Sequence, residues 1–142
     1  MSEHHDYYIA LAHSIAERST CVRAKVGAVL VKDDRILSTG FNGAPKHLTH
    51  CTQESCVVVH AHCIRCVHAE TNALLFADRV QGTIFYITHA PCLFCCQHLI
   101  NAGVSMVYFD QNYNDDRITS LGYVNQQAYL EAAGVQCRRH RK

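Results

Sequence analysis

Apolar residues near the start of the chain recur at helical spacing. They lie one, three or four positions apart, at Tyr8, Ile9, Ala12, Ile15 and Ala16. This spacing predicts a helix over residues 6–18. Two short β-rich runs follow at 26–31 and 35–41, with the polar pair Asp33-Asp34 between them. Two such runs around a polar turn predict a β-hairpin, and the segment from Asn42 to Pro45 ends it.

Helical and β-rich segments alternate through the rest of the chain. The pattern predicts helices at 69–79, 91–103 and 121–133, and strands at 83–88, 104–109 and 135–137. Pro91 suits a first helical position, and Gly103 suits a helix C-terminus. This alternation favours an α/β sandwich with helices on both faces of the sheet. The Cys- and His-rich stretch at about 47–66 interrupts the alternation as an insertion.

The composition narrows the classes of protein. The chain has 142 residues, of which 49% are hydrophobic, so residues 1–142 fit one domain with a substantial core. Its 13 Lys and Arg nearly balance 12 Asp and Glu. This balance disfavours a nucleic-acid coat protein or a membrane-surface binder. No apolar run approaches the ~20 residues that span a bilayer, and the first residues are polar, so we expect a cytoplasmic protein.

Cysteine and histidine are frequent, at 9 and 11 residues. In a reducing compartment such cysteines are more often metal ligands or buried thiols than disulfide partners. They gather in two places. The stretch 51–66 holds four Cys and two His, and the stretch 91–96 holds three Cys. This distribution indicates metal binding.

Two short segments, one just after the first stretch and one within the second, together form one motif. His68-Ala69-Glu70 and Pro91-Cys92-Leu93-Phe94-Cys95 match the H-x-E…P-C-x-x-C signature of zinc-dependent nucleobase deaminases. Cys92 and Cys95 lie three apart at a predicted helix start, where the positive helix end favours their thiolates. With His68 as the third ligand, a zinc ion keeps one open position, where a water can bind and lose a proton near neutral pH.

Glu70 follows His68 by two residues at a predicted helix start, so its carboxylate can reach that water. It would take the proton, deliver it to the ring nitrogen beside the exocyclic amine, and later protonate the leaving ammonia. The alternatives are a structural Cys/His zinc knuckle and a core helix that carries two Cys by chance. The combined motif favours the catalytic interpretation.

Longer segments resemble the deoxycytidylate (dCMP) deaminase family, including its bacterial late-competence and viral branches. The resemblance runs from about Tyr7 to Val135 and includes RSTCVRAKVGAVLVKDDRILSTGFNGAP, VHAETNALLFA and GTIFYITHAPCLFCCQHLINAGV. It implies a cytidine-deaminase-like fold, which is a three-layer α/β/α sandwich with a central mixed five-stranded sheet. It also implies a zinc ion and the hydrolysis of dCMP to dUMP and ammonia, which feeds thymidylate synthesis.

The resemblance also implies roles for individual residues. His68, Cys92 and Cys95 would hold the catalytic zinc, and Glu70 would be the proton shuttle. Three further residues would contact the substrate. Asn42 would touch the sugar, the Ala69 backbone N–H would meet the pyrimidine carbonyl, and Tyr113 would lie over the nucleotide. The family pattern usually has Tyr at the position of Phe41 in this chain.

Many family members bind dCTP as activator and dTTP as inhibitor at a subunit interface. The corresponding positions here are Gly40, Phe41, Asn42, Gly43, Phe76 and Arg79. Mg²⁺ would accompany a bound triphosphate, and the chain would form a homo-oligomer, as a hexamer, trimer or dimer. The alternatives are a plain turn at Gly40–Gly43 and a solvated helix end at Arg79.

The remaining cysteines need a separate role, because the catalytic metal already has three ligands. Some family members carry a second, structural zinc, and the matching positions here are Cys21, Cys51, Cys56 and Cys63, with His60, His62 and Cys66 as alternatives. Such a metal would stabilise a long loop. The alternative is a set of reduced thiols. We expect Cys96 and Cys137 to be packing residues.

Two other functions share parts of these motifs. A tRNA adenosine or DNA cytosine deaminase would use the same zinc site, but it would need clustered cations and stacking aromatic residues for the polynucleotide. A zinc-stabilised nucleotide-binding module without chemistry would not need Glu70. The substrate is therefore expected to be a free nucleotide, with dCMP as the first candidate and dCTP as the second. Four cations near the predicted loops are candidates to contact the phosphate of this nucleotide: Arg23, Lys25, Lys46 and Arg65.

Overall fold

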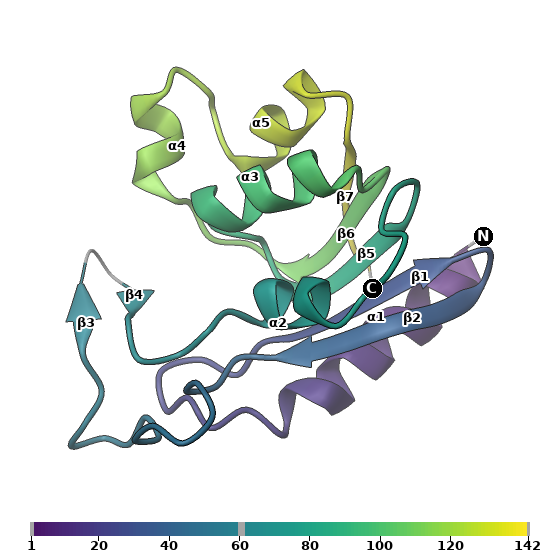
Figure 1. Ribbon diagram of the computed structural model, residues 1–142. Helices are drawn as coiled ribbons and strands as arrows, with labels where there is room; N and C mark the ends of the chain where they lie inside the picture. The colour runs from purple at the N-terminus through teal and green to yellow at the C-terminus, as the bar shows by residue number, and fades with distance from the viewer. Residues whose placement is uncertain (1, 60–61, 142) are drawn as a thin grey trace.

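The computed structural model describes residues 2–59 and 62–141, except for the side chains of Ser2, Glu3 and His62. A five-stranded sheet has the strand order β2-β1-β5-β6-β7, and two short strands, β3 and β4, form a separate ribbon (Figure 1). The strands are Gly27–Lys32 (β1), Arg35–Phe41 (β2), Val58–Val59 (β3), His62–Cys63 (β4), Ile84–His89 (β5), Met106–Gln111 (β6) and Gln136–Arg139 (β7). The helices are Ser2–Ala16 (α1), Ala69–Leu75 (α2), Leu93–Ala102 (α3), Asp116–Ser120 (α4) and Gln126–Ala132 (α5).

The main sheet is mixed. Strand β1 is antiparallel to β2 and to β5, whereas β6 is parallel to both β5 and β7. Helix α3 connects β5 to β6, as a parallel pair requires. In the register of the two central strands, Tyr86 lies opposite Tyr108. The expected α/β fold with a central mixed five-stranded sheet is confirmed.

Helices cover both faces of this sheet. Helix α1 packs on one face, and α2, α3 and α5 lie on the other (Figure 1). Alternate residues of each strand pack on opposite faces of the sheet, because successive side chains of a strand point in opposite directions. Phe85 therefore joins the larger core cluster, on the side of α2 and α3, while Tyr86 packs in the smaller cluster against α1. The result is three layers, helix on sheet on helix.

Two glycines allow helices to approach the hairpin closely. A Cβ atom at Gly27 would lie 2.0 Å from the Ala12 carbonyl oxygen in α1. A Cβ atom at Gly40 would lie 2.3 Å from the Ala69 carbonyl oxygen in α2. Real side chains do not tolerate either distance, so both positions require glycine. The contact at Gly40 holds the first turn of α2, which carries Glu70, against the end of β2.

Two predicted helices were wrong in extent. The helix predicted over 69–79 ends at Leu75, and Arg79 adopts a left-handed φ of 57°. The chain leaves the helix early because Ala77 and Val80 then pack against the core. The helix predicted over 121–133 is α5 alone, and α4 lies before it, between the strand predicted at 104–109 and the start of the predicted helix. Gly122, with a φ of 94°, separates the two helices.

Among the described helices, none is both long and apolar enough to cross a membrane.

Candidate active site

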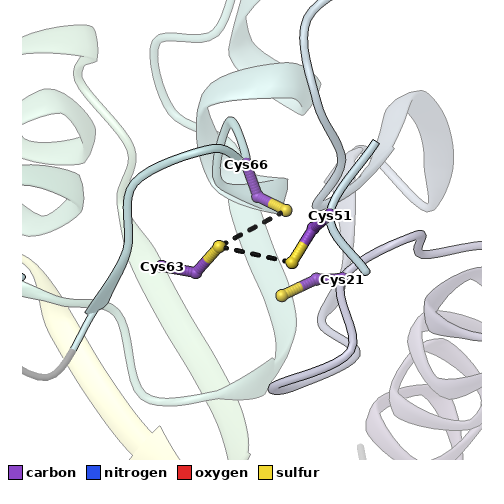
Figure 2. Close-up of side chains that lie close together, drawn as sticks. All are labelled: Cys21, Cys51, Cys63 and Cys66. Carbon is purple, nitrogen blue, oxygen red and sulfur yellow. Dashed lines mark hydrogen bonds between the residues drawn. The ribbon is translucent and has the colours of Figure 1, made fainter. Parts of the chain in front are cut away.

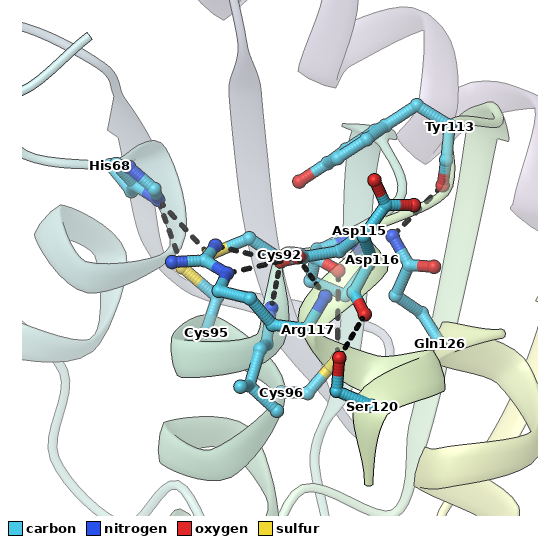
Figure 3. Close-up of polar contacts among 12 residues, drawn as sticks. His68, Cys92, Cys95, Cys96, Tyr113, Asp115, Asp116, Arg117, Ser120 and Gln126 are labelled. Carbon is cyan, nitrogen blue, oxygen red and sulfur yellow. Dashed lines mark hydrogen bonds and ion pairs between the residues drawn. The ribbon is translucent and has the colours of Figure 1, made fainter. Parts of the chain in front are cut away.

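The N-termini of two helices bring the predicted zinc ligands together. His68 is the N-cap residue of α2, and Cys92 is the N-cap residue of α3. The Nδ1 atom of His68 lies 3.3 Å from the Cys95 sulfur and 3.6 Å from the Cys92 sulfur. Figure 3 shows the imidazole facing the two cysteines. Residues that are distant in sequence therefore converge on one point.

This arrangement fits a zinc ion. Tetrahedral bonds of about 2.0 Å to nitrogen and 2.3 Å to sulfur place those two atoms about 3.5 Å apart. The observed distances of 3.3 and 3.6 Å agree with that value. The Cys95 side chain, and then His68 and the Cys95 backbone N–H, stabilise a thiolate at Cys92 and lower its pKa to about 4. A thiolate is the form of cysteine that binds metal.

Glu70 lies beside these three residues. It occupies the first turn of α2, and only 4% of its surface is exposed. Burial raises the pKa of its carboxyl to about 7. Burying a carboxyl is costly, and this one has the His68 and Cys95 side chains among its neighbours. Its position next to the ligand set, and not in the set itself, is that expected of a proton shuttle.

A cavity of about 480 Å³ opens at this site. Its walls include His68, Glu70 and all three residues expected to contact the substrate, Asn42, Ala69 and Tyr113. The volume lies within the range of small-molecule sites. The walls also include Arg23 and His89, of which His89 had no predicted role. One metal ligand, His68, thus shares the cavity with the shuttle and the substrate residues.

The side chain of Asn42 connects the end of β2 to the segment before β1. Its Nδ2 donates to the Ala24 carbonyl oxygen at 2.7 Å, and its Oδ1 accepts from the Val26 N–H at 2.9 Å. One amide hydrogen and one lone pair remain for a ligand, because a primary amide can make four hydrogen bonds. Asn42 can therefore shape the cavity and still contact a sugar.

Tyr113 lies on the loop between β6 and α4. The Gln126 side chain donates to the Tyr113 carbonyl oxygen at 2.8 Å and fixes the loop to the start of α5 (Figure 3). Burial raises the pKa of the Tyr113 hydroxyl, so it stays protonated. Gln126 is 3% exposed, and neither its spacing nor its neighbours in the sequence indicated this role.

A second group of four thiols lies next to the cavity. The sulfurs of Cys21, Cys51, Cys63 and Cys66 all lie within 4.8 Å of one another, and they converge in Figure 2. Two of the separations are 3.6 Å, from Cys51 to Cys63, and 4.0 Å, from Cys63 to Cys66. Disulfide sulfurs would be about 2.05 Å apart. Sulfurs around a tetrahedral zinc ion would be about 3.8 Å apart, so the group has the geometry of a metal site.

The group of four thiols differs from the expected ligand set at one position, where Cys66 takes the place of Cys56. Cys66, expected as an alternative, belongs to the group of four, whereas Cys56 lies beside Cys51 and Cys63 but outside it. Cys66 is buried in the segment that leads to His68, while Cys56 is more exposed. His60 and the side chain of His62 lie outside the described residues. Cys96 and Cys137 both lie in the larger core cluster, as expected of packing residues.

Comparison with known proteins gives the family. The family model for the cytidine and deoxycytidylate deaminase zinc-binding region matches residues 2–111, which include both metal-ligand groups and Glu70. The chain belongs to this deaminase family. The match confirms the family resemblance and makes zinc the metal of the site.

Three relatives of this family member are informative. ComE operon protein 2 of Bacillus subtilis is 41% identical over 133 residues, which cover 91% of this chain and 67% of that protein. Deoxycytidylate deaminase of Saccharomyces cerevisiae is 40% identical over 119 residues, but the chain spans only 38% of its length. The crystal structure of dCMP deaminase from cyanophage S-TIM5 in complex with dCMP and dUMP has a TM-score of 0.77 at 31% identity, with 94% of each chain covered.

Asp115 supports the catalytic helix of this family member. Its carboxylate accepts from the Leu93 backbone N–H at 2.9 Å, and so binds the N-terminus of α3 next to Cys92. It also pairs with Arg117 at 2.7 Å, and the Arg117 guanidinium lies 4.7 Å from the centre of the Phe94 ring. Burial opposes ionisation, but the bonds from Arg117 and Leu93 outweigh it and lower the pKa of Asp115. Figure 3 shows this network beside the cysteines.

Asp115→Ala is expected to destabilise the protein by about 3 kcal/mol, because it removes a helix cap, the acceptor of the Leu93 N–H and the partner of Arg117. For a domain of this size that loss lowers Tm by about 6–12 °C. Thermal unfolding of the zinc-loaded protein measures it. The matched control is Asp116→Ala, one residue along and exposed, which should change Tm by about 2 °C or less. Equal effects of the two substitutions would contradict the supporting role of Asp115.

The expected effector residues lie around α2. Gly40 is buried against that helix, and Gly43 pairs with Val67, just before His68. This turn therefore holds the end of β2 against the segment that leads to the metal site. Phe76 is 71% exposed, and the Lys46 ammonium lies 5.9 Å from its ring centre. Arg79 is exposed as well.

Proposed function

We propose that this protein hydrolyses dCMP to dUMP and ammonia and thereby supplies dUMP for thymidylate synthesis. The observation that carries the proposal is the buried Glu70 carboxyl beside the group of His68, Cys92 and Cys95, with Glu70 and His68 in the wall of the cavity. Two relatives support the choice of substrate: the yeast deoxycytidylate deaminase and the cyanophage enzyme whose structure holds dCMP and dUMP.

His68, Cys92 and Cys95 would hold the catalytic zinc. When bound there, zinc supplies Lewis-acid activation of a water molecule near neutral pH. Glu70 would accept the proton of that water on its carboxylate and transfer it to N3 of the cytosine ring. The same carboxylate would then take the remaining proton of the added hydroxyl at C4 and pass it to the departing amine, so that the C4–N bond breaks and ammonia leaves. The near-complete burial of Glu70 keeps bulk water away from these transfers.

The cavity walls suggest how the nucleotide is held. The Ala69 N–H would donate to the pyrimidine carbonyl, Asn42 would bond the sugar, and Tyr113 would cover the nucleotide. Among the four cations considered for the phosphate, Arg23 lines the cavity. Arg65 instead donates to the Ser55 carbonyl oxygen. Arg23 is therefore the cation proposed to contact the phosphate.

We propose a structural role for the second thiol group as well. Cys21, Cys51, Cys63 and Cys66 would bind a second zinc ion, which would join the insertion to the segment after α1. Three of these residues, Cys21, Cys63 and Cys66, also line the cavity. A metal at this group would therefore stabilise one wall of the substrate site.

Other features expected from the family stay predictions. They are turnover of dCTP, regulation by dCTP and dTTP, Mg²⁺ with a bound triphosphate, assembly into a homo-oligomer, and a cytoplasmic location.

A substrate panel tests the proposed function. Zinc-loaded protein is mixed with dCMP, dCTP, deoxycytidine, CMP or adenosine, and the loss of the amino group is followed by absorbance. We expect the highest kcat/KM with dCMP and none with adenosine. Turnover of adenosine without turnover of any cytosine compound would contradict the proposal and would favour a nucleic-acid deaminase. Turnover of none of the compounds would also contradict it.

A further inference from the structure

His89 lines the substrate cavity and has no role in the proposed reaction. It is the last residue of β5, three positions before Cys92. It pairs with Gln111 of β6, and the next backbone N–H, of Ala90, donates to the Gln111 carbonyl oxygen at 2.9 Å. The sheet therefore fixes the backbone of His89 at the edge of the cavity. A side chain on such a rigid element can serve as a precise ligand contact.

The hydrogen bonds around His89 determine which ring nitrogen carries its proton. The Thr88 hydroxyl lies 2.8 Å from Nδ1 of His89 and also accepts from the Gly27 N–H at 3.2 Å. Thr88 is fully buried, so its hydroxyl hydrogen needs an acceptor, and Nδ1 is within reach. Nδ1 is therefore the acceptor. Burial, and then the neighbouring His13, lower the pKa of His89, which keeps the ring neutral. A neutral ring that accepts at Nδ1 carries its hydrogen on Nε2.

His89 lies in a different electrostatic setting from the metal site. The titratable groups that act on its ring are His13 and Asp110, whose side chains are joined by a hydrogen bond of 2.7 Å. The groups that act on Glu70 are instead His68, Cys92 and Cys95. His89 and Glu70 therefore line the same cavity with different neighbours. With the pyrimidine at Glu70, the rest of the cavity wall, which includes His89, is left for the sugar and phosphate.

Arg23 lines the same cavity and is exposed. Within the described residues, no carboxylate forms an ion pair with its guanidinium. Arg23 and the Nε2–H of His89 thus give the cavity wall one cation and one neutral donor. An anion with several acceptor oxygens matches such a pair.

We propose that His89 is a substrate-binding residue whose Nε2–H donates to an oxygen of the nucleotide 5′-phosphate, with Arg23 supplying positive charge. This inference rests on the proposed dCMP deaminase function. The contact between His89 and the phosphate would let that site select a nucleotide over a nucleoside. Thr88 is a positioning residue, because it acts through Nδ1 of His89.

Kinetics with and without the phosphate test this role. His89→Ala is expected to lower kcat/KM for dCMP by about tenfold to a hundredfold, mainly through KM, because a hydrogen bond to a charged group is lost. The rate with deoxycytidine should change by about twofold or less, because it has no phosphate. His89→Gln keeps an amide donor and should recover part of the loss. His98→Ala, on the exposed face of α3, is the matched control and should behave as wild type.

An equal loss with dCMP and deoxycytidine would overturn the phosphate contact, as would no loss with either. Binding of the product to zinc-loaded protein gives a readout that needs no turnover. In calorimetry, His89→Ala should weaken the binding of dUMP by about tenfold or more and leave the binding of deoxyuridine unchanged. If wild-type protein fails to deaminate dCMP but still binds dUMP through His89, the proposed function fails and the phosphate contact stands.

The wild-type protein offers a test that no folding defect can disturb. Long-range proton–nitrogen NMR of the His89 ring should show the hydrogen on Nε2, and dUMP should shift the Nε2 resonance while deoxyuridine should not. A hydrogen on Nδ1, or equal shifts with the two ligands, would overturn the proposal.

Discussion

Glu70→Gln is expected to lower kcat for dCMP by at least about a hundredfold while the zinc content stays unchanged. The amide has nearly the shape of the carboxyl but cannot accept and release the proton. The carboxyl is buried beside the three metal ligands and is not one of them, so its loss should not release the metal. Steady-state kinetics and metal analysis of the same preparation measure the two effects.

Glu17→Gln is the matched control for this substitution. Glu17 is exposed just after α1, so its replacement should leave kcat and zinc unchanged. A Glu70→Gln protein with more than a tenth of wild-type kcat would refute the proton-shuttle role. A Glu70→Gln protein that has lost zinc would show that the carboxyl supports the metal instead.

Cys51→Ala is expected to remove about one zinc ion per chain and to destabilise the insertion. Three remaining thiols do not complete a structural site, because structural zinc sites are almost always four-coordinate. Zinc binding by such sites contributes on the order of 10 kcal/mol to folding in small domains, so the effect should be large. Metal analysis and limited proteolysis within the insertion at 47–66 measure these losses. Activity should fall too, because Cys21, Cys63 and Cys66 line the cavity.

Cys56→Ala is the matched control, because Cys56 lies beside Cys51 and Cys63 but outside the group of four. It should keep its zinc and its resistance to protease. Unchanged zinc in Cys51→Ala would reject the second metal site. Loss of zinc in Cys56→Ala with retention in Cys66→Ala would instead support the ligand set expected from the sequence.

The fold could be predicted where local patterns agree with the packing. The β-rich runs around Asp33-Asp34 became β1 and β2, and the strand–helix–strand order from Ile84 to Gln111 became β5, α3 and β6. The break between α4 and α5 was missed because apolar residues continue across it. Gly122 and the N-cap Asn125 were its local signals. The predicted end of α2 was wrong for another reason: the point where that helix ends depends on tertiary contacts of Ala77 and Val80.

The site could be predicted where chemistry fixes the spacing. Cys92 and Cys95 must lie on one helix face, and a histidine two residues before a glutamate at a helix start places a metal ligand beside a carboxylate. Asp115 was missed because its main contact, the Leu93 N–H, is 22 residues away in sequence. Spacing also could not separate Cys66 from Cys56, because a loop can bring either thiol to the group. His89 had no sequence signal, since its role depends on the cavity and on Thr88.

The most direct test of the central claim is the reaction of dCMP with zinc-loaded protein in ¹⁸O-labelled water, with the product analysed by mass spectrometry. We expect dUMP that carries one solvent-derived oxygen at C4, formed together with ammonia and reduced at least about a hundredfold in Glu70→Gln. Unchanged dCMP in the presence of bound zinc, or dUMP formed at the same rate by Glu70→Gln, would contradict zinc-dependent deamination with Glu70 as the proton shuttle.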